Sequence, residues 1–202
     1  MRWNNYGPEL PRILYRLKSM GYVVFDGDKD YDLNLIGVRS KSREPGKWDD
    51  HFYVVYKELG DWIEEVYECT TDPSAEQHLD PTNPKGVALL KAGQYRGVWK
   101  LDMHRGKYLA LCQRGAEVTV YRDRNRDLYS NMGVGVPEET GWFGINCHRG
   151  HSSRLVETTK WYSSGCQVIW SPIDWARLIT LAQLQVEHGL GNSFTYTLVE
   201  EQ

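Results

Sequence analysis

Residues 87–121 are VALLKAGQYRGVWKLDMHRGKYLALCQRGAEVTVY, a stretch in which short apolar runs alternate with glycine-containing turns. The runs fall at 87–90, 95–100, 107–113 and 117–121. Short strands at such regular spacing are typical of an antiparallel sheet or a barrel. The stretch therefore predicts a mainly β fold whose core is an antiparallel β-sheet or barrel.

Apolar runs of the same kind occur on both sides of this stretch. We expect further strands at 33–38, 52–57, 62–70, 142–148, 166–170 and 194–198. The segments 40–50, 71–85 and 122–140 are polar or rich in proline, and we expect them to be surface loops.

Two helices complete the predicted fold, one near each end of the chain. Residues 8–20 carry leucine and isoleucine on one helical face, and Gly21 follows as a stop. The second helix begins after Ser171, a residue type that caps helices well, and ends at Gly189. The predicted class is α+β, mainly β, with an N-terminal helix and a C-terminal helix.

The composition predicts one folded domain over residues 1–202. Hydrophobic residues make up 41% of the chain and charged residues 25%, and no repeat or linker divides it. Within this domain, we expect 1–85 to supply a helix and strands, and 86–202 to supply the β core and the second helix.

Net charge and hydropathy exclude two classes of partner. The net charge of −3 argues against a nucleic-acid binder, which needs a broad basic face. No apolar run is long enough to insert into a membrane, and the N-terminus shows no signal segment. We therefore expect a protein that is cytoplasmic when made and reaches any external target by another route.

Cys166 differs from the other three cysteines. Cys69, Cys112 and Cys147 lie in apolar alternating runs, so they are expected to be buried core residues. Cys166 instead follows two serines and a glycine at the entry to a predicted strand. No C-x-x-C pair is present, which argues against a zinc ribbon and a dithiol redox motif.

His148 lies at the end of the predicted strand 142–148, where side chains alternate between two faces. The apolar side chains of this strand share one face, so His148 should point the other way, toward a cleft or solvent. The segment after His148 is long enough to return Cys166 to an adjacent strand. A thiol attacks efficiently as a thiolate or beside a base, and histidine is the usual base near neutral pH.

The spacing of these residues resembles the catalytic signature of the L,D-transpeptidase catalytic domain. That signature has a histidine, fourteen to seventeen residues, and then Ser/Thr-His-Gly-Cys. Here His148 is followed by fourteen residues and then by Ser163-Ser164-Gly165-Cys166. The similarity covers roughly residues 86–170. It implies a β-rich fold whose cysteine attacks a stem peptide of peptidoglycan and forms a thioester.

The resemblance also implies roles for individual residues. Cys166 is the nucleophile and His148 the general base. Ser163 and Gly165 shape the turn before the cysteine, and backbone N–H groups near Cys166 stabilise the oxyanion.

The chain departs from the signature at two positions. Ser164 stands where the family has a second histidine, and Val168 stands where a polar residue is usual. Serine cannot replace an imidazole, so a contact of the family site is lost here or supplied elsewhere. His151 or His104 could supply it.

Several side chains near the signature are candidates for substrate binding. Arg149 could pair with a substrate carboxylate through two hydrogen bonds, although an ordinary surface charge explains it equally well. Trp142 could stack against a sugar or another flat ligand. Together with Ser163, His151 and His104, they form the expected substrate-binding set.

The sequence predicts no cofactor and no metal. Residues 123–127 resemble the start of a calcium loop, but Leu128 occupies the glycine position and arginines oppose a cation, which favours an ion-paired turn. A zinc site of His148, His151 and Cys166 is a minor alternative without an evident fourth ligand.

The residues and the resemblance together predict a cysteine enzyme that acts on bacterial peptidoglycan. Because no export signal is seen, a phage endolysin-like peptidase that cleaves wall stem peptides fits best. Two alternatives stay open: an L,D-transpeptidase that makes cross-links, and a catalytically inactive wall-binding or virion structural module. In the last case Trp142, Trp161 and Tyr162 would form the binding platform.

Overall fold

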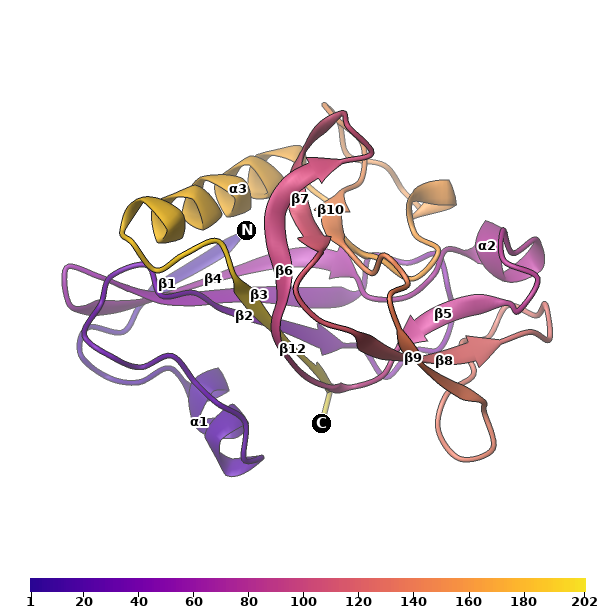
Figure 1. Ribbon diagram of the computed structural model, residues 1–202, viewed down its shortest axis with the longest axis horizontal. Coiled ribbons are helices and arrows are strands. Elements are labelled where there is room, and N and C mark those ends of the chain that lie inside the picture. Colours follow the sequence, from indigo (N-terminus) through magenta and orange to yellow (C-terminus); the bar gives the residue numbers. More distant parts are fainter.

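The computed structural model describes residues 1–202, with 37% of them in strands and 16% in helices. The predicted α+β, mainly β class is confirmed. The elements follow one another (Figure 1) as β1 (Arg2–Asn5), α1 (Arg12–Ser19), β2 (Asn34–Arg39), β3 (Asp50–Glu58), β4 (Asp61–Thr70), α2 (Ala75–Leu79), β5 (Val87–Leu90), β6 (Gly93–His104), β7 (Tyr108–Gln113), β8 (Val118–Asp123), β9 (Glu138–Gly141), β10 (Cys147–Arg149), the 3-10 helix η1 (Lys160–Tyr162), β11 (Gln167–Ile169), α3 (Pro172–Glu187) and β12 (Phe194–Glu200).

Eight strands close into a barrel. Around the ring their order is β4-β11-β10-β7-β6-β12-β2-β3, and β3 pairs with β4 to complete it. β1 pairs with β4 outside the ring, while β5, β8 and β9 form a separate three-stranded sheet, seen at the right of Figure 1. Residues 1–85 and 86–202 both supply strands to the ring.

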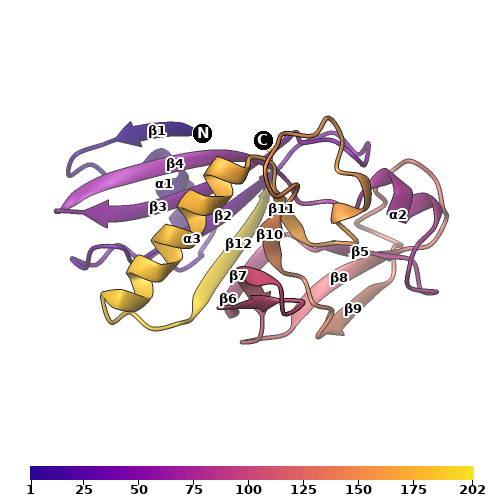
Figure 2. The same cartoon turned by 90° about the horizontal axis from the view of Figure 1, so that it is seen from above.

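Two neighbouring pairs in the barrel are parallel, β10 with β11 and β12 with β2. Parallel neighbours need a long connection, because the chain must return to the same end of the sheet. Residues 150–166 supply that connection between β10 and β11, and they run beside α2 (Figure 2). This parallel pair carries the candidate site.

A cluster of 27 buried apolar residues joins the barrel to α3 and to the sheet that contains β5 and β8. Within it the rings of Trp99 and Tyr196 stack with centroids 4.4 Å apart. Both also bind the strands of the site: Trp99 Nε1–H donates to the Ile145 carbonyl at 2.8 Å, and Tyr196 Oη–H donates to Gln167 Oε1 at 2.7 Å. The core thereby fixes the chain just before β10 and within β11.

The two predicted helices are present. Leu14 and Leu17 of α1 are buried in a second, smaller apolar cluster. α3 lies across one side of the barrel (Figures 1 and 2), and the Ser171 hydroxyl accepts from the Asp174 N–H at 3.3 Å, as expected of an N-cap. None of the helices has the length and apolar character needed to cross a membrane.

The predicted surface loop at 71–85 is wrong. The segment contains α2, and Asp72, Ser74, Gln77 and His78 are buried. Hydropathy does not reveal this burial, because the buried side chains are polar; Gln77 Oε1 accepts from the Thr82 hydroxyl at 2.6 Å, and Asp72 pairs with Arg39. The predicted loop at 122–140 also contains the end of β8 and the start of β9.

The strand predicted at 142–148 is also wrong over most of its length, since only Cys147–Arg149 pair as a strand. Gly144 has φ +72°, which interrupts the extended backbone. The buried side chain of Gln113 takes the place of a partner strand: its Oε1 accepts from the N–H groups of Phe143 at 3.2 Å and Ile145 at 2.9 Å.

Candidate active site

The parallel pairing of β10 with β11 places Cys166 and His148 on one face. In this register His148 lies opposite Val168, and Cys147 lies opposite Gln167. Because side chains alternate along a strand, Cys166 shares the face of Val168 and is therefore a diagonal neighbour of His148. Cys147 points into the core, where it is fully buried, as its position in an apolar run predicts.

The turn before Cys166 is held by Ser163. Its hydroxyl donates to the Cys166 carbonyl at 2.8 Å and accepts from the Gly165 N–H at 3.1 Å. Ser163 is fully buried, so its expected contact with substrate is wrong and its role is to shape the turn. Ser164 is exposed, and its hydroxyl has no hydrogen-bond partner in the protein.

Gly165 stands where no other residue fits without strain. Its φ is +135°, and a Cβ there would lie 2.1 Å from the Ala88 carbonyl oxygen. We predict that Gly165→Ala lowers the free energy of unfolding by about 3 kcal/mol, since backbone strain and overpacking each cost about 1–3 kcal/mol. Gly144→Ala is the matched control: φ is +72° but nothing lies within 4 Å of the added Cβ, so only the left-handed cost of about 1–2 kcal/mol is expected. Urea unfolding measures both, and equal losses would contradict the close approach.

His148 has one ring nitrogen committed to the backbone. Its Nδ1 lies 2.8 Å from the Arg149 carbonyl oxygen. A carbonyl only accepts, so Nδ1 carries the proton and Nε2 of the neutral ring is the basic nitrogen. Burial lowers the pKa of His148 to about 4, although the Arg149 carbonyl acts in the opposite direction. His148 is therefore neutral at physiological pH and can accept a proton.

Cys166 is half-buried, and its Sγ–H donates to the Gly144 carbonyl at 3.4 Å. Burial raises the pKa of the thiol, which outweighs the lowering by the Asn146 backbone N–H and by Arg105. No hydrogen bond joins Sγ to His148. Thiol and imidazole are thus both neutral at rest, so any nucleophilic attack by the sulfur would require proton transfer to a base such as His148.

One backbone N–H beside the thiol remains available to an oxyanion. The Gly165 N–H donates to Ser163, and the Gln167 N–H donates to the Asn146 carbonyl at 2.8 Å. The Cys166 N–H donates to no group of the protein. This is the type of donor that the resemblance implies near the cysteine.

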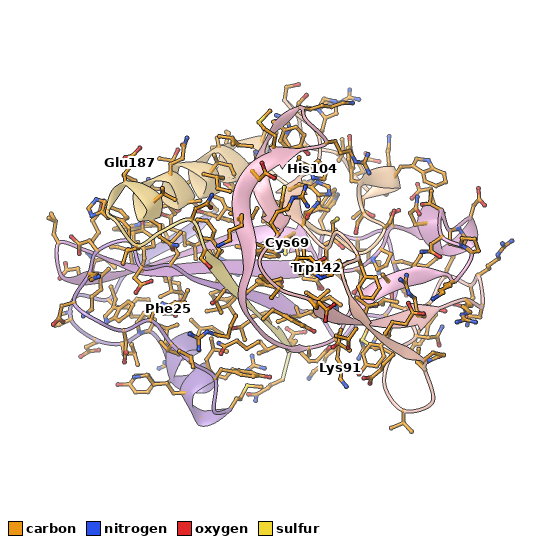
Figure 3. The ribbon with its side chains drawn as sticks, in the orientation of Figure 1. Phe25, Cys69, Lys91, His104, Trp142 and Glu187 are labelled. Atoms are coloured by element: carbon orange, nitrogen blue, oxygen red, sulfur yellow. The ribbon has the colours of Figure 1, made fainter.

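Cys166 opens into a cavity of about 500 Å³, here called the thiol cavity. The exposed side chains of Trp142 and Trp161 line it, as do Ser164 and His148. Figure 3 labels Trp142 beside the barrel. The segment 81–84 forms another part of the wall, so residues before 86 contribute to the site as well as to the barrel.

A second cavity of about 310 Å³, here called the basic cavity, lies on another side of His148. Arg149, His151 and His104 line it, together with Lys107. Arg105, His148, Trp161 and Tyr162 line both cavities. The two histidines proposed to replace the second imidazole of the signature therefore lie away from the thiol cavity.

His104 contacts the ring of His148 and does not line the thiol cavity. Its ring centroid lies 4.7 Å from that of His148, at the end of β6 where Figure 3 labels it. Asn146 Oδ1 accepts from the Gln113 N–H at 2.7 Å, which leaves Asn146 Nδ2 to face His104 Nδ1 at 3.3 Å. No role is predicted for Asn146 from the sequence, where the only sign of it is a polar side chain two positions before His148.

The structure contains no group of three or more His, Cys, Asp or Glu side chains placed to hold a metal ion, so His148, His151 and Cys166 do not form a zinc set. The turn at 123–127 is not ion-paired as expected. Its carboxylates bind amides, since Asp123 Oδ2 accepts from the Asn131 N–H at 2.9 Å and Asp127 Oδ2 accepts from Asn125 Nδ2 at 2.8 Å.

No family model, curated protein or solved structure matches this chain. The similarity to the L,D-transpeptidase catalytic domain therefore stays a prediction, carried by the histidine and cysteine positions. The function has to be argued from the geometry of the thiol cavity and its neighbour.

Proposed function

We propose that this protein is a cysteine-dependent enzyme that hydrolyses stem peptides of bacterial peptidoglycan through a thioester on Cys166. One observation carries the proposal. The β10–β11 pairing sets a thiol and a neutral imidazole, with Nε2 unprotonated, on one face at the wall of one cavity.

The chemistry follows from these positions. Cys166 Sγ attacks the carbonyl carbon of the scissile amide while its proton passes to His148 Nε2. The Cys166 N–H donates to the oxyanion. The C–N bond then breaks as His148 returns the proton to the departing amine. Water attacks the thioester with His148 as base, which releases the acid and restores the thiol.

The walls of the thiol cavity suit a wall fragment. Trp142 is 56% exposed and Trp161 is 59% exposed, so both can stack against sugar rings or other flat groups. Arg105 and Arg122 are the charged residues of the wall, and no carboxylate lines it; Arg122 is paired with Glu139, which leaves Arg105 as the unpaired cation. Stem peptides are anionic, so the charge of Arg105 supports a peptidoglycan substrate.

Digestion of purified sacculi by the native chain tests the proposal. We expect soluble fragments whose masses show a new carboxyl end, and a transient increase in protein mass on Cys166 equal to one acyl group. New cross-linked products in place of cleaved ones would assign transpeptidation. No products from any wall type would overturn the enzyme assignment.

The pH dependence provides a second test. We predict that kcat/KM for fragment release rises with pH about a midpoint near 4 and is level from pH 5.5 to 7.5, because His148, with a pKa of about 4, accepts a proton only when neutral. Initial rates at low substrate concentration measure this profile. His51→Gln, in β3 and outside both cavities, should leave the midpoint unchanged. A midpoint near 6.5, the ordinary histidine value, would contradict the burial argument.

A wall-binding module without catalysis is the second candidate. The raised pKa of Cys166 favours it, since a module has no need of a thiolate. In that case the native chain would bind sacculi through its exposed tryptophans and release nothing, and mutation of Cys166 would leave binding unchanged.

A further inference from the structure

The basic cavity is positively charged, although the chain as a whole is not. Its eleven lining residues include Arg105, Lys107 and Arg149 and no aspartate or glutamate. The whole chain carries a net charge of −3. The overall composition does not explain this cluster of cations in one cavity, and a local positive charge of this kind attracts anionic ligands.

These three cations are free of carboxylate partners. None takes part in any ion pair of the structure. Arg149 is half-buried and lies with its guanidinium carbon 4.2 Å from the centre of the Tyr108 ring. Stacking on an aromatic face holds the guanidinium plane while leaving its N–H groups for a ligand.

The histidines of the cavity are also donors. His151 Nδ1 accepts from the Ser153 N–H at 3.2 Å, so its neutral ring carries the proton on Nε2. The Asn146 amide donates to His104 Nδ1, which gives His104 the same tautomer. Apart from His148, whose Nε2 is the proposed base, each cationic or histidine side chain of the wall therefore has at least one N–H that can donate to a ligand.

We propose that the basic cavity is a subsite for the terminal carboxylate of the substrate fragment that departs from Cys166. The inference rests on the proposed function, because His148 protonates the departing amine and lies between the two cavities. A planar carboxylate matches the two parallel N–H groups of Arg149. A volume of about 310 Å³ admits the end of a peptide and not a glycan chain. The enzyme should therefore select stem peptides that end in a free acid.

Calorimetry in a Cys166→Ala background tests this selection without turnover. The probes are a synthetic four-residue stem peptide ending in a free carboxylate and the same peptide ending in a carboxamide. We expect the acid to bind about tenfold tighter than the amide, the effect of one good charge-assisted contact. Adding Arg149→Met should remove this preference. Lys107→Met, at an exposed position that leaves the Arg149–Tyr108 stack intact, should reduce it. Arg154→Met, which removes a cation outside both cavities, should preserve it.

The remaining outcomes distinguish failure of the carboxylate subsite from failure of the proposed function. Equal affinity for acid and amide would overturn the subsite, while fragment release from sacculi would still support the proposed function. If neither peptide binds and sacculi stay intact, the proposed function fails. Titrations with acetate and with inorganic phosphate, followed by the His151 ring signals in NMR, then show whether the basic cavity binds carboxylates. Acetate shifts that Arg149→Met abolishes would support a carboxylate site. No acetate shift, or tighter binding of inorganic phosphate, would overturn it.

Discussion

Replacing Cys166 with alanine should lower the rate of fragment release from sacculi by about 10³-fold or more, because the acyl group then has no sulfur to bond to. The variant should fold as well as the native chain. The thiol makes a single weak hydrogen bond, to the Gly144 carbonyl, and its removal leaves no buried group unpaired except that carbonyl. Release kinetics and thermal unfolding of the same samples measure both effects.

Cys69→Ala is the matched control for this substitution. Cys69 is fully buried in β4 and lines neither cavity, so its loss should cost stability and leave the rate per folded molecule unchanged. If Cys166→Ala and Cys69→Ala release fragments equally fast, the nucleophile is another group and the thioester mechanism is wrong.

Replacing Arg39 with methionine should lower the free energy of unfolding by about 3–5 kcal/mol, the cost of removing one partner from a buried ion pair. Arg39 is 1% exposed, and its Nε lies 2.9 Å from Asp72 Oδ1. Burial disfavours its charge, but Asp72, Glu200 and Asp50 outweigh that effect and raise the pKa of Arg39. Without the guanidinium, the carboxylates of Asp50 and Asp72 stay buried beside each other.

The loss should depend on pH. Burial and the neighbouring Asp72 raise the pKa of Asp50 to about 7. A carboxyl with a raised pKa in the folded state contributes stability at low pH and loses it as pH rises from about 4, its unfolded value, toward 7. Urea unfolding of Arg39→Met should therefore show a larger loss at pH 8 than at pH 5. Arg114→Met breaks the exposed pair with Asp102 and a hydrogen bond to the Gln113 carbonyl, and should cost about 1 kcal/mol. A loss for Arg39→Met as small as that would contradict a structural role for the buried network.

Periodicity predicted those parts of the fold that are set by local burial. The run at 87–90 is β5, and the helix after Ser171 is α3, because alternation and capping act within a few residues. β1 has four exposed residues and is held to β4 by backbone pairing and by polar side chains such as Asn4, which donates to Glu64, so no hydrophobic pattern marks it. Neither alternation nor capping predicts the backbone of 142–146, because the side chain of Gln113, some thirty residues earlier, determines its shape.

Some features of the candidate site could also be predicted from the sequence, and others could not. The sequence predicted that Cys166 returns beside His148, because the segment between them is long enough, and that Cys147 is buried, because it lies in an apolar alternating run. It placed Ser163 among the substrate contacts, because a serine hydroxyl looks alike whether it faces a ligand or closes a turn. The basic cavity could not be predicted. Its cations come from the β6–β7 turn and the end of β10, which only the strand register brings together.

Because His148 lines both cavities, the proposed mechanism would couple substrate recognition to reactivity. With a pKa of about 4, its imidazole is a weak base for a thiol whose own pKa is raised. A carboxylate held beside the ring favours the protonated imidazole and so strengthens the base. A substrate ending in a free acid would thus activate the residue that cleaves it, whereas an amide end would occupy the same place without that gain. Selectivity for the free acid would then appear in kcat as well as in affinity, because the carboxylate of the bound substrate would raise the basicity of His148.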